Sequence, residues 1–221
     1  MIKRIIQLSI LLTVCLLVKN LPIFEKFNRS YLKDYDPNYC VKYEDYSSEA
    51  VSYFNEIALK TESGLTLRYL SKYTEDVFIY VEGHQPKYIQ EELQKIVFDL
   101  NMIIDPIEVH ITENKSESNL IVTIGSLKEI RKRYQIFLSH RFDNSRGGFS
   151  IGNENFSHCF LNTKNIESVE SAKHVLREEI TQSLGLPNDS WKYAESIFYQ
   201  GGSTSMKYSE LDKQLISMLY N

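Results

Sequence analysis

Hydrophobic positions recur with two periods along the chain, and these periods predict both helices and strands. Apolar residues three and four apart indicate helices, whereas short β-branched or aromatic runs indicate strands. The predicted helices cover residues 48–59, 86–104, 127–134, 169–184 and 210–219, with a further helix or turn around 65–73. The predicted strands cover 77–81, 107–111, 120–124, 149–151 and 158–161. This pattern predicts an α+β domain in which helices pack on a small mixed sheet.

The helix predicted over residues 169–184 has the strongest signal. Its apolar stripe consists of Ala172, Val175, Leu176, Ile180 and Leu184. Gly185 follows directly and suits the left-handed conformation that ends many helices, with Pro187 just beyond.

This helix also carries polar residues toward its apolar side. At about 100° per residue, Glu179 falls inside the apolar arc, while His174, Glu178 and Gln182 line up beside it. Burying an isolated charge is costly, so we expect Glu179 to be hydrogen-bonded, paired, protonated or placed at a cleft.

The N-terminus has the pattern of an export signal. Met-Ile-Lys-Arg precedes an apolar run from Ile5 to Val18. The run is shorter than the about 20 apolar residues of a membrane span, but no small-x-small cleavage site follows it. Secretion and tethering therefore both stay open. We predict a signal peptide or membrane anchor over 1–22, a lead-in over 23–47 and one domain over 48–221, exported to the cell envelope.

The three cysteines leave two questions open. Residues 12–15 loosely resemble a lipoprotein box that would lipidate Cys15, but Val14 stands where a small residue is expected, which favours an ordinary apolar leader. Cys40 and Cys159 form an even pair in an exported chain, so one disulfide is an open alternative. Their spacing does not indicate a zinc site.

Composition excludes one class of partner. The formal net charge is -4, and Lys and Arg are not clustered outside the extreme N-terminus. A nucleic-acid-binding protein would carry a basic patch or stripe. We therefore expect no nucleic-acid partner.

Residues 177–189 resemble the metzincin zinc signature H-E-x-x-H-x-x-G-x-x-H/D in spacing. In that family one helix presents two histidines as metal ligands, with a glutamate between them as general base. By this resemblance, Glu178 and Gln182 take the two histidine positions. Glu179 takes the general-base position.

The rest of the signature follows in order. Gly185 falls at the turn, and Asn188 takes the third-ligand position with Asp189 beside it. Every ligand position thus holds a residue that is wrong for zinc. Oxygen donors from Glu178, Gln182 and Asp189 would suit Ca²⁺, Mg²⁺ or Mn²⁺ better, so no cofactor is assigned and a divalent metal stays an open alternative.

A second part of the resemblance lies downstream. Residues 195–199 resemble the turn that underlies the metal in these peptidases. In this turn Ser196 and Ile197 match, Phe198 replaces the methionine, and Tyr199 comes one place early. Residues 208–220 resemble the family's closing helix, which also ends in Leu-Tyr.

Taken together, these segments resemble an uncharacterised bacterial family, a domain of unknown function grouped with the zincin-like peptidases. That family carries E-E-x-T-Q-x-L-G, then N-D, S-I-F and a terminal L-Y, all of which occur here. The resemblance implies a zincin-like (metzincin-like) α+β fold. Such a fold has a small mixed twisted sheet, a long backing helix, an active-site-type helix and a C-terminal helix.

Three hypotheses follow for function. The leading one is an inactive peptidase relative that binds peptide or protein by strand addition to the sheet edge, expected near 158–161. The second is a divergent metallopeptidase or hydrolase in which Glu179 activates water. The third is a structural or interaction lipoprotein whose cleft is filled by side chains.

Overall fold

The computed structural model describes residues 45–61, 69–134, 147–153, 155–202 and 205–220. The predicted leader 1–22, nearly all of the lead-in 23–47, Cys40 and residues 65–68 of the element expected at 65–73 lie outside these ranges. The rest of that element, residues 69–73, is described and is not helical. None of the helices described is both long and apolar enough to cross a membrane.

The described elements agree with the predicted ones to within a few residues. The strands are β1 (Val77–Gly83), β2 (Val109–Ile111), β3 (Leu120–Gly125), β4 (Gly148–Asn153) and β5 (Phe156–Asn162). The helices are α3 (Ser48–Ala58), α4 (Lys87–Asn101), α5 (Leu127–Tyr134), α7 (Val169–Ser183) and α8 (Glu210–Tyr220).

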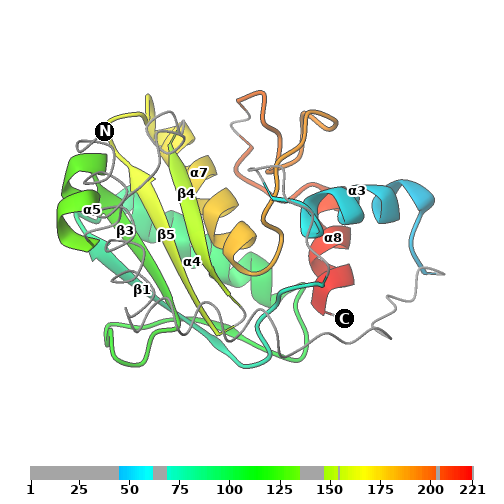
Figure 1. The fold of residues 1–221 in the computed structure, drawn as a ribbon, viewed down its shortest axis with the longest axis horizontal. Helices are drawn as coiled ribbons and strands as arrows, with labels where there is room; N and C mark the ends of the chain where they lie inside the picture. Colours follow the sequence, from blue (N-terminus) through cyan, green and yellow to red (C-terminus); the bar gives the residue numbers. More distant parts are fainter. Residues whose placement is uncertain (1–44, 62–68, 135–146, 154, 203–204, 221) are drawn as a thin grey trace, which may run out of the picture. The chain divides into compact units, whose positions relative to one another are not determined.

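The strands form one five-stranded mixed sheet in the order β2-β1-β3-β5-β4 (Figure 1). Strands β2, β1, β3 and β5 run parallel to one another, and β4 pairs with β5 in the antiparallel direction. The prediction of an α+β domain with a small mixed sheet is therefore confirmed.

The prediction of which strand forms the sheet edge is wrong. Strand β5, which contains residues 158–161, lies between β3 and β4, and the edge is formed by β4. Residues Ser157 to Asn162 are all buried, as expected for an interior strand. The polar residues Ser157, His158 and Asn162 gave this strand the appearance of an exposed one, but their side chains are satisfied inside the protein.

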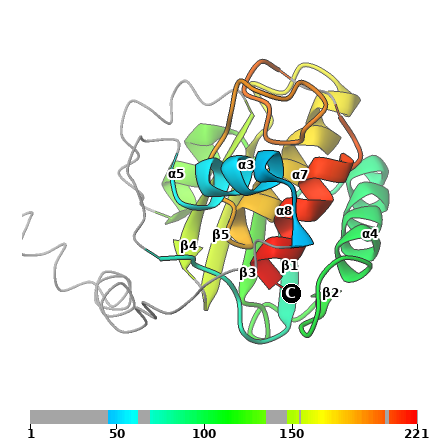
Figure 2. The same cartoon turned by 90° about the vertical axis from the view of Figure 1, so that its right-hand side faces the viewer.

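Helices cover both faces of the sheet (Figure 2). On one side, the Cys159 thiol lies 3.3 Å from the backbone carbonyl oxygen of Glu179 on α7. On the other, Phe160 packs with Ile130 of α5. His158 also faces this second side, where it stacks on Phe160 with ring centroids 4.1 Å apart. His158 and Cys159 thus point to opposite faces of the sheet.

Helices α3 and α8 flank the segment that follows α7. Tyr46, just before α3, has its hydroxyl 2.9 Å from that of Ser217 on α8. Within the segment, Ser190 and Tyr199 form an isolated parallel bridge. The end of the predicted turn at 196–199 is therefore brought beside Ser190.

Candidate functional site

Helix α7 begins and ends at well-defined caps. The Ser168 hydroxyl accepts a hydrogen bond from the Ser171 N–H at 3.0 Å, as an N-cap residue should. Gly185 has φ of 125°, which confirms the predicted left-handed turn, and a Cβ there would overlap the Ser71 carbonyl oxygen. The Tyr220 hydroxyl donates to the carbonyl of Leu184 at 2.7 Å. The end of α7 is thus locked by both the preceding chain and the C-terminal helix.

Glu178, at the first histidine position of the signature, faces a histidine on its own helix. Its Oε2 lies 3.7 Å from Nε2 of His174, one turn earlier. The other ring nitrogen, Nδ1, lies 2.9 Å from the carbonyl oxygen of Ser205 and must donate to it. Burial and the nearby Arg177 lower the pKa of His174, against the effect of the Ser205 carbonyl. These effects together favour the neutral form of His174.

Gln182 and Asp189 are brought together by the turn at Gly185. The Gln182 side-chain amide donates to Oδ1 of Asp189 at 2.7 Å. This contact joins the second histidine position to the residue beside the third-ligand position. The amide of Gln182 thus bridges the helix and the loop after it.

Asn188, at the third-ligand position itself, is turned toward α3. Its side-chain amide donates to the backbone carbonyl of Glu56 at 3.0 Å. Glu56 also accepts from the Ser190 hydroxyl at 2.7 Å and pairs with Lys192. Burial alone would raise the pKa of Glu56, but Lys192 and Ser190 outweigh it and hold this pKa below its usual value. The loop after α7 is thereby anchored to α3.

Glu179, at the general-base position, is buried against the edge strand. It is 4% exposed, as expected from its place in the apolar arc. A Cβ built on Gly148 of β4 would lie 2.5 Å from Glu179 Oε1 and 2.7 Å from its Cγ. Only glycine allows β4 to approach the carboxyl group so closely. Glu179 therefore supports β4 from behind.

The turn at 196–199 is built around a buried carboxylate. Ser196, Ile197 and Phe198 are fully buried, and Tyr199 is half-buried. The Ser196 hydroxyl donates to Asp212 Oδ1 at 2.6 Å, and the Ile197 N–H donates to Oδ2 at 3.2 Å. Burial raises the pKa of Asp212 despite these hydrogen bonds. The Tyr53 hydroxyl of α3 completes the cluster by donating to Ser196 at 2.9 Å.

The residues at the ligand positions do not fit zinc. Zinc sites in proteins use histidine nitrogen and cysteine sulfur, with carboxylates as a minority. Here Glu178, Gln182 and Asn188 face three different partners instead of one common point. Across the ranges that the structure describes, no three His, Cys, Asp or Glu side chains are grouped so as to hold a metal ion.

A family model described as "Protein of unknown function (DUF2927)" matches residues 47–221. This chain belongs to the DUF2927 family. No curated protein matches the sequence.

The DUF2927 domain is also similar to two solved structures of myroilysin. The match to the first has a TM-score of 0.44 and 13% sequence identity, and it covers 68% of this chain and 82% of the myroilysin chain. The second has a TM-score of 0.46 and 11% identity, and covers 76% of this chain and 92% of that one.

Sequence reasoning missed two residues that organise this DUF2927 domain. Asp212 follows Ser209 by three positions, and the two exchange hydrogen bonds of 2.8 and 3.1 Å as a capping box. That spacing before an apolar helix was a readable signal. Arg177 is 1% exposed and pairs with Glu92 and Asp99 of α4 at 2.8 and 2.6 Å. No local pattern could have revealed a pairing across that separation.

Proposed function

We propose that this domain binds an extended peptide or protein segment by adding it as a strand beside β4. The observation that carries the proposal is the character of the edge. Strand β4 has six residues, Gly148 to Asn153, and none of them is charged or a proline. Natural sheets usually blunt an exposed edge with charges, proline, bulges or shortening. An edge of this length without such protection is suited to pairing.

The backbone register of β4 shows which groups would bind. The Asn162 N–H donates to the Gly147 carbonyl, and β4 continues in antiparallel register from there. Because antiparallel strands alternate between bonded and non-bonded pairs, Phe149 and Ile151 face β5 with their backbone groups. The N–H and C=O groups of Gly148, Ser150 and Gly152 then point away from β5, to the side on which no described strand pairs with β4. Two of these three are glycines, so side chains hinder an approaching strand little.

The polar residues at the end of α7 act as support in this proposal. Glu179 lies directly behind Gly148, and the other signature residues hold the loop after α7 in place. This arrangement gives β4 a rigid backing. A preformed edge loses less conformational entropy when a peptide binds than a mobile one would.

Substitution of Ser150 by proline provides the sharpest test. Peptides would first be selected by display against the full chain, and their affinities measured by calorimetry. Ser150→Pro removes the outward N–H but spares the ladder to β5, and we expect affinity to fall by about tenfold or more. Ser150→Ala is the matched control, because it removes the side chain and keeps the N–H. Equal affinities for wild type and Ser150→Pro, with unchanged thermal unfolding, would refute strand addition.

Hydrolysis with Glu179 as general base is the second candidate. The position of this carboxyl group behind β4 favours it, since a bound strand would lie next to that edge. The selected peptides would be incubated with wild type and Glu179→Gln, with mass spectrometry for cleavage and metal analysis of the protein. We expect binding by both and cleavage by neither. The hydrolase candidate would replace the binding proposal if the protein held stoichiometric metal and cleaved the peptides, and if Glu179→Gln abolished the cleavage.

We also propose that the chain acts outside the cytoplasm, carried there by residues 1–22. The support is the Lys-Arg start followed by the apolar run. Fractionation of cells that express the chain with a C-terminal tag, followed by N-terminal sequencing, would test this. Recovery of the intact chain in the cytosol would contradict it.

A further inference from the structure

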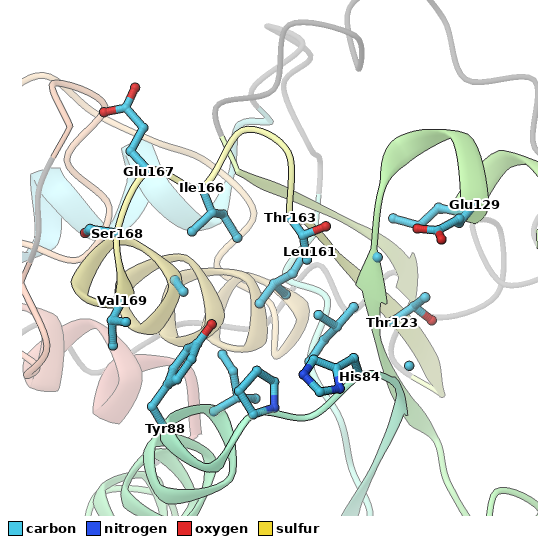
Figure 3. A pocket seen from close by; sticks show the side chains of 17 residues that line it. His84, Tyr88, Thr123, Glu129, Leu161, Thr163, Ile166, Glu167, Ser168 and Val169 are labelled. Carbon is cyan, nitrogen blue, oxygen red and sulfur yellow. The ribbon is translucent and has the colours of Figure 1, made fainter.

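A cavity of about 750 Å³ lies at the other end of α7, away from the residues of the zinc-like signature. It opens where the carboxyl ends of β1, β3 and β5 meet the first turns of α4, α5 and α7 (Figure 3). Cavities of about 300–1,000 Å³ are typical of small-molecule sites, and the carboxyl ends of parallel strands are a common place for them.

The floor of this cavity is apolar and buried. It is formed by five side chains that are each no more than 8% exposed: Ile89, Ile124, Ile130, Leu161 and Ala172. They come from α4, β3, α5, β5 and α7. The position of this apolar surface is therefore set by the packing of these helices on the sheet. Such a floor would release ordered water when an aliphatic or aromatic group covers it.

Polar groups surround this floor. In Figure 3, Tyr88 and His84 lie on one side of the cavity and Thr163 on the opposite side, with Ser168 at the start of α7. The Tyr88 hydroxyl points toward the cavity. An apolar floor with a few hydroxyl and imidazole groups at its rim suits a ligand that has an apolar body and one polar head.

Charge at the rim favours a positive head. Glu129 and Glu167 are among the described residues that line the cavity, and none of those residues is a Lys or Arg. The Glu167 carboxylate points outward from the mouth in Figure 3, and Glu129 Oε2 accepts hydrogen bonds from the N–H and hydroxyl of Ser126. Three helix N-termini oppose this effect with partial positive charge, but α5 and α7 already have Glu129 and Glu170 in their first turns. Only α4 has neither an acidic residue in its first turn nor a side-chain cap. Because Glu129 offsets the N-terminus of its own helix, the full negative charge of Glu167 remains at the mouth against about half a positive charge at the N-terminus of α4.

We propose that this cavity binds a small molecule with an aliphatic or aromatic body and a positively charged amine head. The site is separate from the proposed peptide edge, because none of its lining residues belongs to β4. Ligand binding here and peptide binding at β4 can therefore succeed or fail independently.

A matched pair of probes tests the proposal on the full chain. 4-Phenylbutylamine and 4-phenylbutyrate share one apolar body and differ in the charge of the head. We expect the amine to shift the amide NMR signals of Gly83, Gly125 and Thr163, with an affinity about fivefold higher than that of the carboxylate. Glu167→Lys should reduce this preference, since Glu167 is exposed and its replacement leaves the core unchanged.

Two variants locate the site. Ala172→Phe fills the floor, and Thr163→Trp covers the mouth from an exposed position that does not depend on core repacking. Each should weaken amine binding by about tenfold or more. The proposal is overturned if neither probe shifts these signals or if the shifts lie elsewhere. It is also overturned if the carboxylate binds as well as the amine, or if Thr163→Trp binds the amine as well as wild type does.

Discussion

The two edges of the sheet are built differently. Strand β2 has three residues and is followed at once by a loop, whereas β4 has six residues in continuous antiparallel pairing with β5. His110 of β2 lies within 4.0 Å of carboxylate oxygens of Asp76 and Glu108, so polar side chains lie along this edge. Strand β4 has no charged residue at all. The short edge, with carboxylates beside it, has features that hinder pairing, whereas β4 lacks such features.

The helices behind the two edges are tied together by one arginine. Helix α4 packs against β2, α7 packs against β4, and Arg177 of α7 pairs with Glu92 and Asp99 of α4. Its guanidinium also lies 4.8 Å from the centre of the Tyr208 ring. This cluster fixes the spacing of the layer beneath both edges.

The largest expected effect comes from breaking this cluster. Arg177→Met leaves the carboxylate of Glu92, which is 1% exposed, without its cation. We expect the free energy of unfolding to fall by about 3–5 kcal/mol, measured by urea denaturation. The double variant Arg177→Met with Glu92→Leu is the control, because it removes both charges, and it should recover most of the loss. A double variant as unstable as the single one would contradict this account of the cluster.

Acid should weaken the sheet beside the β4 edge. Burial lowers the pKa of His158 on β5 to about 4; by smaller amounts, Glu82 raises this pKa and Lys115 lowers it further. In the unfolded chain this histidine takes up its proton near pH 6.5, so the unfolded state binds more protons between about pH 6.5 and 4. Stability should therefore fall by up to about 3 kcal/mol as pH drops through that window.

Urea denaturation at several pH values checks this effect. His158 lies 2.8 Å from the Thr123 hydroxyl, which in turn donates to Glu82. His158→Gln keeps a polar group at this position but cannot titrate, so it should flatten the pH dependence between 6.5 and 4. A slope of the same size in this variant would assign the effect to other groups.

How much of the fold could be predicted from the sequence depended on how far apart in the chain the interacting residues lie. Helix α7 and its end at Gly185 were predicted because the apolar stripe and the glycine lie within one short segment. The position of β5 inside the sheet was not, because Ser157, His158 and Asn162 suggest exposure. Their partners, such as Thr123 for His158, come from distant parts of the chain.

The same limit applies to the candidate site. The sequence placed Glu179 inward, and the structure confirms that it is buried. The partner of Asn188, on α3, lies 132 positions away, so no local pattern identified it. Spacing could therefore identify the residues at the signature positions, but it could not predict that each would face a different partner.

A smaller effect is expected from adding a methyl group behind β4. Gly148→Ala places a Cβ 2.5 Å from Glu179 Oε1 and 2.7 Å from Val175 Cγ1, so both side chains must move. We expect a loss of about 1–3 kcal/mol in urea denaturation. Gly125→Ala is the matched control at the end of β3, where the new Cβ would have only ordinary contacts of 3.5 Å or more. Equal losses in the two variants would show that Glu179 and Val175 do not support β4 closely.

The smallest effect is expected at the protected edge. Ile111 on β2 is 44% exposed, so Ile111→Lys should change the free energy of unfolding by no more than about 0.5 kcal/mol. Peptide affinity, measured by calorimetry, should stay the same. Loss of peptide binding in Ile111→Lys would indicate that the peptide pairs with β2 and not with β4.

Amide hydrogen exchange in the presence of a selected peptide tests the strand-addition account most directly. The N–H groups of Gly148, Ser150 and Gly152 point away from β5, whereas those of Phe149 and Ile151 point toward it. We predict that the peptide slows exchange at the first three positions much more than at the other two. Slowing that is equal at all five positions, or absent from Gly148, Ser150 and Gly152, would contradict strand addition at β4.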